Sequence, residues 1–404
     1  MDTLFDPARH ETLAGAPWHE DTARAALQRI ADDANARFDP DSGWPAHPLD
    51  DPEQPDDRIH MLYSGAGGVV WALEHLARAG AIHHKPDFRA FVAGLVPKNR
   101  AALGQPQHGT QSYLLGDAGL LLLQWTLGHD EAVADVLLAV VRSNLHNPVR
   151  EALWGSPGTV LAAVFMAEFT KQARWTALVR EAVQISWDEM ESVAEFDGIW
   201  LWRQDLYGRP CTLLGAGHGF AGNVFPALRG AAFLDAPLVQ AFADRALHTL
   251  KATARHADGA INWMPEPETA AKPYLRSPLV QDCHGAPGIV CRLSGAPRSA
   301  EWDALLLGAG ELSWRAGPLS KGASLCHGTA GSAMAMLKLW RRSGDGRWLD
   351  RARALAMHGV YQVERHRAQY GMGRYSLWSG DLGLACVLWN CLQGSDHFPT
   401  LDVF

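Results

Sequence analysis

Two cysteine–histidine pairs of this sequence stand in the same local pattern. Cys283-His284 and Cys326-His327 are each followed directly by a glycine, and a second glycine comes three residues after the first. Thiolate sulfur and imidazole nitrogen are ligands that suit Zn²⁺, and three protein ligands leave a fourth coordination position for water or substrate. The two Cys-His-Gly-x-x-Gly segments therefore predict a zinc site, although the residues alone leave open which histidine binds the metal.

The competing interpretation is that these cysteines belong to the hydrophobic core. Free cysteine is among the most buried residue types and often acts as a small apolar side chain, and no Cys-x-x-Cys spacing supports a metal site here. Recurrence of the same tetrad 43 residues apart favours the metal. The other cysteines are Cys291, Cys386 and Cys391, which lie in apolar helical runs typical of a core, and Cys211, for which both interpretations stay open.

The Gly-x-x-Gly element recurs through the whole chain. Its seven copies begin at residues 65, 116, 155, 219, 285, 328 and 380, and an apolar helical run follows each copy. An amphipathic segment with helical spacing precedes each copy. These segments cover approximately residues 20–37, 86–103, 130–146, 172–193, 236–256, 299–315 and 346–364. Self-similarity of this kind indicates a repeat architecture.

The repeats predict an all-α fold in which seven buried helices are covered by seven amphipathic helices. A ring of inner helices within a ring of outer helices, the α/α toroid, satisfies both sets. No low-complexity linker interrupts the repeats, so we expect one domain over residues 1–404. Residues 196–214 mix aromatic, glycine and polar residues and include a hairpin-like segment at 198–202. Such long loops and short strands on one rim often build the functional face.

Composition narrows the classes of function. The 404 residues carry a formal net charge of −8, which argues against a nucleic-acid backbone as the main partner. Six cysteines in a chain of this length do not form a disulfide framework. The first 21 residues have no apolar signal core, and no run approaches the roughly 18 apolar residues of a membrane span. We therefore expect a cytoplasmic protein without a membrane span.

These motifs resemble those of the lanthionine synthetase C-like (LanC-like) family over nearly the whole chain. The most specific segments are residues 283–288, 321–328 and 215–222. The resemblance implies the α/α toroid of that family. The repeated Cys-His-Gly and the Lys321-Gly322 pair make the chain more similar to the stand-alone branch that uses glutathione than to the dedicated lantibiotic cyclases.

The resemblance also implies a set of site residues. The zinc ligands would be Cys283, Cys326 and His327, which would leave His284 as a neighbour of the metal. His218 matches the site histidine of the family, and Lys321 matches a cation beside the metal. The chain departs from the family at Asp282, where a tryptophan usually precedes the first cysteine, and this places a carboxylate near the zinc or its surroundings.

The implied activity is addition of a thiol to dehydroalanine or dehydrobutyrine in a peptide. The thiol would be glutathione or a peptide cysteine. Attack gives a thioether and an enolate, and His218 is the expected acid because imidazole titrates near neutrality; the alternative is a hydrogen-bonded core histidine. Asp117 would orient His218 or else cap its own helix. Lys321 would bind a substrate carboxylate or the enolate, unless it is a solvated loop residue, and Arg374 is a further candidate for substrate binding.

Two other functions stay open at this point. A glycoside hydrolase on the same fold would need two carboxylates that flank a sugar bond, and no pattern pairs the available Asp117, Asp205, Asp282 and Asp381. A non-catalytic zinc-binding or glutathione-binding scaffold would have a closed site, with His284 or Asp282 as fourth ligand. A zinc ion with an open position for a thiol would favour the enzyme.

Overall fold

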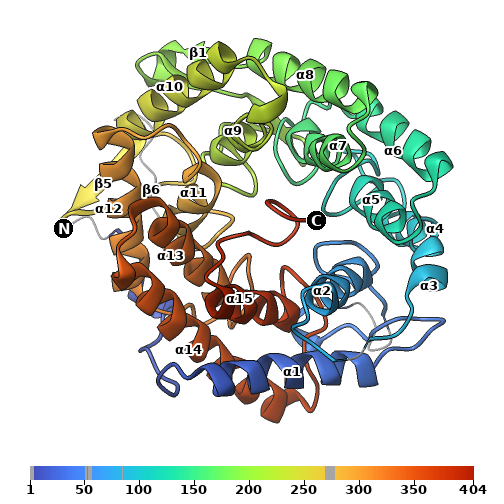
Figure 1. Ribbon diagram of the computed structural model, residues 1–404. Coiled ribbons are helices and arrows are strands. Elements are labelled where there is room, and N and C mark those ends of the chain that lie inside the picture. Colours follow the sequence, from blue (N-terminus) through green and yellow to red (C-terminus); the bar gives the residue numbers. More distant parts are fainter. Residues whose placement is uncertain (1–3, 51, 53–56, 84, 269–277) are drawn as a thin grey trace. The chain divides into compact units, whose positions relative to one another are not determined.

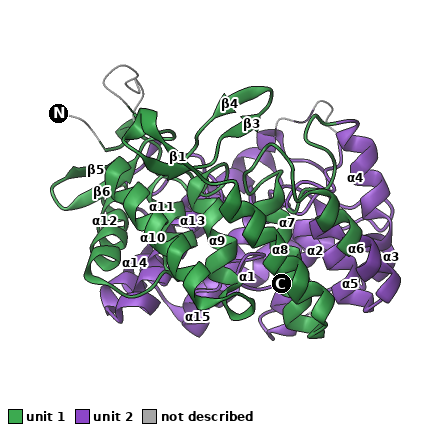
Figure 2. Cartoon of the chain, turned by 90° about the horizontal axis from the view of Figure 1, so that it is seen from above, with its two compact units in different colours: residues 1–8, 106–113, 137–316 green, residues 9–105, 114–136, 317–404 purple. Residues whose placement is uncertain are grey.

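The computed structural model describes residues 4–50, 52, 57–83, 85–268 and 278–404. The chain forms two compact units, which Figure 2 distinguishes by colour. Residues 1–8, 106–113 and 137–316 make up the first unit, and residues 9–105, 114–136 and 317–404 make up the second. One helix, α6 (Glu131–Ser143), contains residues of both. The expectation of a single domain over residues 1–404 stays a prediction.

In the first unit, helices that are apolar on nearly all sides alternate with helices that have a polar face. The apolar helices are α7 (Ser156–Thr170), α9 (Phe220–Arg229) and α11 (Ala286–Leu293). The amphipathic helices are α8 (Ala173–Asp188), α10 (Ala236–Thr253) and α12 (Ala300–Ala316). Figure 1 shows α9 between α7 and α11, and each of the amphipathic helices packs on one of these three.

The second unit repeats the alternation. Its apolar helices are α2 (Ala66–Arg78), α5 (Asp117–Gly128), α13 (Thr329–Ser343) and α15 (Asp381–Gln393). Its amphipathic helices are α1 (Glu20–Ala36), α3 (Arg89–Ala93), α4 (Leu95–Leu103) and α14 (Gly346–Tyr370). Helix α15 packs against α1, α2, α13 and α14, so it is covered on several sides (Figure 1). A helix in that position must be apolar around most of its circumference, as its sequence is.

Each Gly-x-x-Gly motif of the sequence heads one apolar helix, as predicted. Within the described residues the seven apolar helices α2, α5, α7, α9, α11, α13 and α15 follow the seven amphipathic segments in chain order. One predicted amphipathic helix, 86–103, is instead broken into α3 and α4 at Gly94. Pro97 explains the break because proline has no N–H to donate to the carbonyl of residue 93.

The second glycine of the motif allows each helix to start against the loop before it. A Cβ at Gly222 would overlap the carbonyl oxygen of Ala216, six residues earlier in the chain. The same relation with the carbonyl six residues earlier holds at Gly68, Gly158, Gly288 and Gly383. The recurrence of this close approach gives the repeat its physical basis, since any side chain at these positions would push the turn away from the helix.

Among the residues that the structure describes, the strands are short and pair as three antiparallel hairpins, which lie in the first unit. They are β1 (Glu191–Val193) with β2 (Ile199–Leu201), β3 (Gln204–Leu206) with β4 (Arg209–Cys211), and β5 (Ala254–Ala257) with β6 (Ala260–Trp263). The hairpin-like segment predicted at 198–202 contains β2. Hairpins β3–β4 and β5–β6 each turn through two residues, both at positive φ: Tyr207-Gly208 and Asp258-Gly259.

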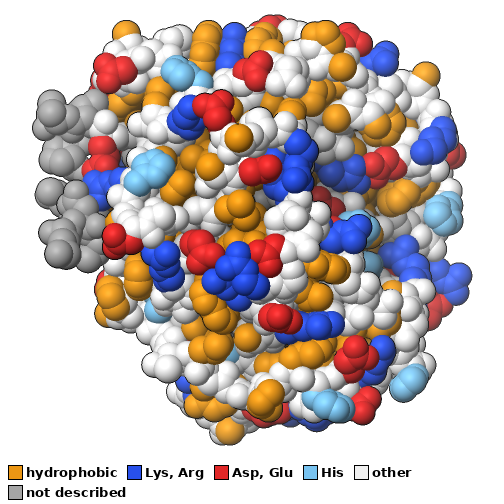
Figure 3. Space-filling view, turned by 60° about the vertical axis from the view of Figure 1, so that its left-hand side comes forward, with side chains coloured by type: hydrophobic (Ala, Val, Ile, Leu, Met, Phe, Trp, Pro, Cys, Tyr) orange, Lys and Arg blue, Asp and Glu red, His pale blue; other side chains and the backbone are white. Residues whose placement is uncertain are grey.

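The surface carries charges of both signs. On the face drawn in Figure 3, basic and acidic side chains lie among one another and between apolar side chains. Ion pairs such as Arg203 with Glu191 and Arg29 with Glu364 are exposed. Across the described ranges, none of the helices combines the length and the apolar composition that crossing a bilayer requires.

Candidate functional site

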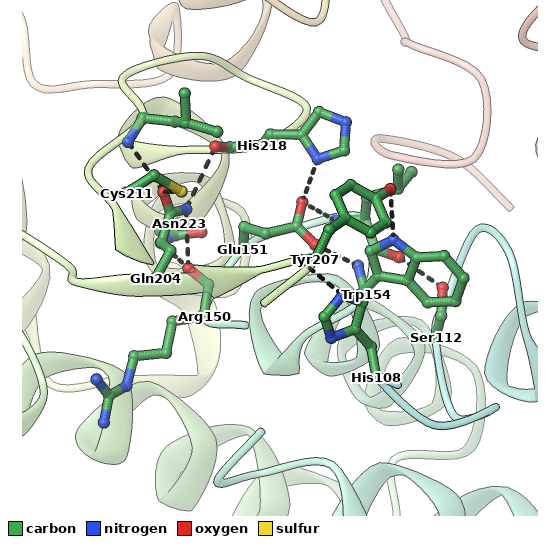
Figure 4. A network of polar contacts seen from close by, with 12 residues as sticks. His108, Ser112, Arg150, Glu151, Trp154, Gln204, Tyr207, Cys211, His218 and Asn223 are labelled. Carbon is green, nitrogen blue, oxygen red and sulfur yellow. Dashed lines mark hydrogen bonds and ion pairs between the residues drawn. The ribbon is translucent and has the colours of Figure 1, made fainter. Parts of the chain in front are cut away.

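His218 lies at the start of α9, one residue before the N-cap Gly219. Its Nδ1 is 2.9 Å from Oε2 of Glu151, as Figure 4 shows. The side chain of Glu151 is fully buried, whereas that of His218 is 22% exposed. A carboxylate at Nδ1 orients the imidazole and leaves Nε2 as the nitrogen that can exchange a proton with a ligand.

Glu151 is held by backbone donors as well as by the histidine. Its Oε1 accepts a hydrogen bond from the N–H of Trp154 at 2.6 Å, and its Oε2 accepts one from the N–H of Leu153 at 3.0 Å. A buried carboxylate needs such partners, because an unpaired charge in this environment would be strongly destabilising. The arrangement therefore gives His218 a fixed anionic neighbour.

Glu151 was not among the site residues predicted from the sequence. Glu151 stands four residues before the first glycine of the third motif, and Gln281 and Ser324 stand at the same place before the fifth and sixth motifs. Gln281 contacts Cys283, and Ser324 lines the cavity described below. Ser112 and Ser376 stand at the same place before the second and seventh motifs, so a polar residue at this position does not by itself single out the turns that carry the candidate site residues.

Asp117 was expected to orient His218 or to cap its own helix. The structure places it as the first residue of α5, after the N-cap Gly116, so the capping alternative is wrong. Arg100 binds its carboxylate through Nε and through a terminal nitrogen, at 3.0 and 2.8 Å. The carboxylate at the His218 ring is Glu151. A role for Asp117 in the chemistry stays a prediction.

Cys283 lies in the turn before α11 and is buried, with 5% of its surface exposed. The amide Nε2 of Gln281 donates to its sulfur at 2.9 Å, so the side chain of Cys283 is held by a partner within its own turn. The neighbouring ring of His284 stacks on that of His218, with centroids 5.8 Å apart. The first unit thus brings Cys283, His284, His218 and Glu151 together.

Gly217 explains how the turns of Cys283 and His218 come so close. The N–H of Gly217 donates to the carbonyl of Cys283 at 3.0 Å. A Cβ at Gly217 would lie 2.8 Å from the Cβ of Cys283, which is closer than two such carbons can approach. Glycine is therefore required at this position if the two turns are to touch.

Asp282, the residue before Cys283, has its own partner. Its carboxylate receives hydrogen bonds from both terminal nitrogens of Arg292 in α11, at 3.2 and 2.7 Å. The two side chains are 1% and 5% exposed. The carboxylate that was expected to lie near the zinc is therefore balanced by the charge of Arg292, ten residues later in the chain.

The buried pair gives a stability prediction. Arg292→Met is expected to lower the free energy of unfolding by about 3–5 kcal/mol, because it leaves the carboxylate of Asp282 buried without its counter-charge. The double variant Asp282→Asn, Arg292→Met should recover much of that loss. Urea denaturation of the three proteins measures both values. A double variant as unstable as the single one would show that packing of Arg292, and not its charge, stabilises this turn.

Cys326 and His327 lie in the turn before α13, in the second unit. The sulfur of Cys326 is 3.6 Å from Nε2 of His327, and the side chain of Cys326 is 4% exposed. The N–H of Cys326 donates to the carbonyl of Trp378 at 2.9 Å, which fixes the turn against the segment before α15. A sulfur and an imidazole nitrogen this close together can bind the same metal ion.

His327 opens onto a cavity of about 580 Å³ in the second unit. Lys321 and Arg374 also line this cavity. Both cations that were predicted to bind substrate therefore share a cavity with His327. The remaining lining residues are Leu49, Asp50, Ile59, Tyr63, Ser64, Ser320, Ser324, His366, Tyr370 and Ser379. A cavity of this size accommodates a small polar molecule.

The two cations differ in their partners. Lys321 is exposed, and in the described part of the chain no carboxylate pairs with it. Arg374 is bound by the second unit itself, because its Nε donates to Oδ1 of Asp50 at 2.7 Å and a terminal nitrogen donates to the carbonyl of Leu49 at 3.1 Å. Since Lys321 has no such partner, it is the cation best placed to bind an acidic ligand. His366 lines the same cavity, and burial, with the nearby charges of Arg365 and Arg374, lowers its pKa.

Comparisons with known proteins agree on one family. The family model of the lanthionine synthetase C-like proteins matches residues 15–403. Glutathione S-transferase LANCL1 of Danio rerio is 26% identical over 376 residues, which cover 86% of this chain and 86% of that protein. LanC-like protein GCL1 of Arabidopsis thaliana is 32% identical over 136 residues, which cover 32% of this chain and 31% of the relative.

A solved structure supports the fold. Nisin cyclase is similar with a TM-score of 0.62 and 15% sequence identity, and the match covers 94% of this chain and 99% of that chain. A likeness at this level of identity shows the fold, so the all-α class with α/α-toroid architecture predicted from the sequence is confirmed. Because the family model spans nearly every residue, the chain belongs to the lanthionine synthetase C-like family.

Proposed function

We propose that this protein catalyses zinc-dependent formation of carbon–sulfur bonds, adding the thiol of glutathione or of a peptide cysteine to dehydroalanine or dehydrobutyrine residues. The observation that carries the proposal is the cavity in which His327 lies together with Lys321 and Arg374. A residue that can bind metal thus faces a space with cationic groups for an acidic thiol. Family membership and a relative named as a glutathione S-transferase support the same class of reaction.

Cys283, Cys326 and His327 are the proposed zinc ligands. They offer two sulfur atoms and one imidazole nitrogen, a donor set that suits zinc. Both thiols are buried, and Gln281 donates to the sulfur of Cys283, as expected of a residue that supports a metal-binding thiolate. Bound zinc would supply a Lewis acid, which lowers the pKa of a thiol near it.

His218 is the proposed acid. When the thiol sulfur bonds to the β-carbon of a dehydroalanine residue, the electrons of the carbon–carbon double bond move toward the amide oxygen and form an enolate. The thiol releases its own proton to solvent, and His218 gives a proton to the α-carbon through Nε2 and takes one back from solvent. The net result is addition of the S–H group across the double bond. Glu151 keeps the ring oriented through Nδ1 and stabilises its protonated form.

Lys321 is the proposed anchor for the acidic group of the thiol substrate. Lys321→Ala is expected to raise KM for glutathione about tenfold and to leave the melting temperature unchanged, since the side chain is exposed. Arg374→Ala should instead lower the free energy of unfolding by about 1–3 kcal/mol, because the carboxylate of Asp50 is only 6% exposed and would lose its partner. Initial-rate kinetics and urea denaturation separate the two effects, and equal KM values for wild type and Lys321→Ala would contradict the assignment.

The proposed partners follow from the chemistry. The protein needs a peptide or protein that already contains a dehydroamino acid, which an elimination reaction at serine, threonine or a phosphorylated derivative would supply. Glutathione is abundant in the cytoplasm, and we propose that compartment as the place of action. Neither a nucleic acid nor a membrane is required by the reaction.

The decisive experiment is to incubate the purified protein with Zn²⁺, glutathione and a peptide that contains dehydroalanine. Mass spectrometry should show a peptide whose mass has increased by one glutathione, formed faster than in the absence of protein. Zinc and glutathione binding without a gain in peptide mass would indicate a non-catalytic scaffold instead. Hydrolysis of a glycoside panel with no thiol addition would indicate a hydrolase.

A further inference from the structure

We infer that Tyr207, at the tip of hairpin β3–β4, recognises the peptide that carries the dehydroamino acid. The inference rests on the proposed function, because it assigns the electrophilic substrate to the surface beside His218. Three observations carry it: the backbone conformation of Tyr207, the exposure of its ring, and the way the hairpin is bonded to the residues that hold His218.

The backbone conformation of Tyr207 is unfavourable for a tyrosine. Its φ is +54° and that of Gly208 is +72°, the pattern of a two-residue type I′ turn. Such turns strongly prefer asparagine, aspartate or glycine at the first position, because a bulky side chain is strained at positive φ. The same chain shows the usual solution in hairpin β5–β6, where Asp258 takes that position with a φ of +50°.

A strained backbone conformation points to a function of the side chain when a different residue at that position would make the fold more stable. A tyrosine kept in place of asparagine or aspartate suggests that its side chain has a use that the fold does not require. The ring does not supply core packing, because Tyr207 is 60% exposed, the highest value among the large exposed apolar and aromatic side chains of the described residues. An exposed, positionally fixed aromatic ring is typical of a binding surface.

The position of the ring is set by the residues around Glu151. Trp154 donates its backbone N–H to Glu151 and its indole N–H to the hydroxyl oxygen of Tyr207, at 3.1 Å, so that one residue contacts both (Figure 4). The N–H of Tyr207 donates to Nε2 of His108 at 3.1 Å, and the rings of these two residues meet edge to face at 5.3 Å. Tyr207 is therefore held in place on the turn that carries Glu151.

The base of the hairpin is bonded to the same structure. The amide Nε2 of Gln204 donates to the carbonyl of His218 at 3.3 Å and to that of Arg150 at 3.2 Å. The N–H of Asp205 donates to the carbonyl of Pro148 at 3.0 Å. The hairpin and His218 thus belong to one hydrogen-bonded network, which keeps the tip of the hairpin at a constant position relative to the acid.

The network favours the electrophile over the thiol as the partner of Tyr207. His218 must reach the α-carbon of the dehydroamino acid, and the peptide chain continues from that carbon on both sides. Residues next to the reacting one must therefore pass close to the structure that holds His218. An aromatic ring binds flanking peptide groups through its face without requiring a particular side chain, so Tyr207 would bind peptides with broad sequence tolerance.

The test uses Tyr207→Asn, which supplies the residue that the turn prefers. With a dehydroalanine peptide of several residues, kcat/KM should fall at least about fivefold, while addition of glutathione to N-acetyl-dehydroalanine methylamide, which has no flanking residues, should be unchanged. The melting temperature should be at least that of wild type. Tyr207→Phe keeps the ring and should keep the preference for the peptide, although it loses the contact with Trp154.

Two controls separate the possible failures. Asp258→Tyr creates the same strained turn in hairpin β5–β6 and should lower the melting temperature without changing the ratio of kcat/KM between peptide and small substrate. Equal losses of Tyr207→Asn on both substrates, or no loss on either, would overturn the inference. If wild type adds glutathione to neither substrate, the proposed function fails. Calorimetry with the same peptide, carrying alanine in place of dehydroalanine, then tests the role of Tyr207 in peptide binding alone. Equal Kd values for wild type and Tyr207→Asn would refute that role.

Discussion

Cys326→Ala is expected to remove both zinc binding and thiol addition. The variant loses one of the two proposed sulfur ligands. Loss of a residue that only hydrogen-bonds to a metal ligand already lowers metal affinity about 10- to 100-fold. Loss of the ligand itself should therefore weaken zinc binding at least about 100-fold. Without the metal, the incoming thiol keeps its ordinary pKa and is a poor nucleophile near neutrality. Metal analysis after gel filtration and the glutathione-addition assay measure the two effects on one preparation.

Cys386→Ala is the matched control for this variant. Cys386 lies in α15 of the same unit, and its thiol is buried, with 1% of its surface exposed. Burial raises the pKa of Cys386 to about 12, so it stays a protonated, apolar side chain. We expect this variant to lose some stability but to retain zinc and activity. Zinc bound in full by Cys326→Ala, or lost equally from both variants, would contradict the proposed ligand set.

His218→Ala is expected to keep zinc and lose turnover. Removal of a general acid typically costs about 10²- to 10⁴-fold in rate, and we expect kcat for glutathione addition to fall within this range. The zinc content should be unchanged, since His218 is not one of the proposed ligands. The combination of retained metal and lost kcat distinguishes a proton donor from a ligand, because loss of a ligand would reduce both.

Glu151→Gln provides a graded comparison. The glutamine keeps the size of the side chain but removes the charge that stabilises the protonated ring of His218, so kcat should fall less than in His218→Ala and its pH profile should shift. Glu151→Gln combined with His218→Ala should be no slower than His218→Ala alone, because Glu151 acts through the histidine. Additive losses in the double variant would show that Glu151 has a separate function.

The sequence determined the helices because their signals are local. A glycine at each turn and an apolar or amphipathic period along the following residues depend only on neighbours in the chain, and the positions of α2, α5, α7 and the other apolar helices agree with them. Local chemistry also explains the one break that was not predicted, at Gly94 and Pro97. The two Cys-His pairs, at residues 283–284 and 326–327, were singled out for the same reason, whereas the choice of His327 over His284 and the selection of His218 came from the resemblance to the LanC-like family.

The partners of those residues were decided by tertiary structure. Glu151 is 67 residues from His218 in sequence, and Arg374 is 324 residues from Asp50, so no periodicity could pair them. Asp282 illustrates the limit, since its sequence neighbour is a proposed metal ligand but its carboxylate is bound by Arg292. A buried charge takes whichever partner the folded chain brings within hydrogen-bonding distance.

The sequence by itself therefore determined the helical repeat, the turns in which the proposed site residues lie and the family to which the chain belongs. Only the tertiary structure decided that Glu151 holds His218, that Asp282 is neutralised, that Lys321 and Arg374 share a cavity with His327, and that Tyr207 stands exposed at the tip of its hairpin. The physical reason is that helix formation follows from spacing along the chain, whereas ion pairs, cavities and side-chain exposure arise where distant segments pack together.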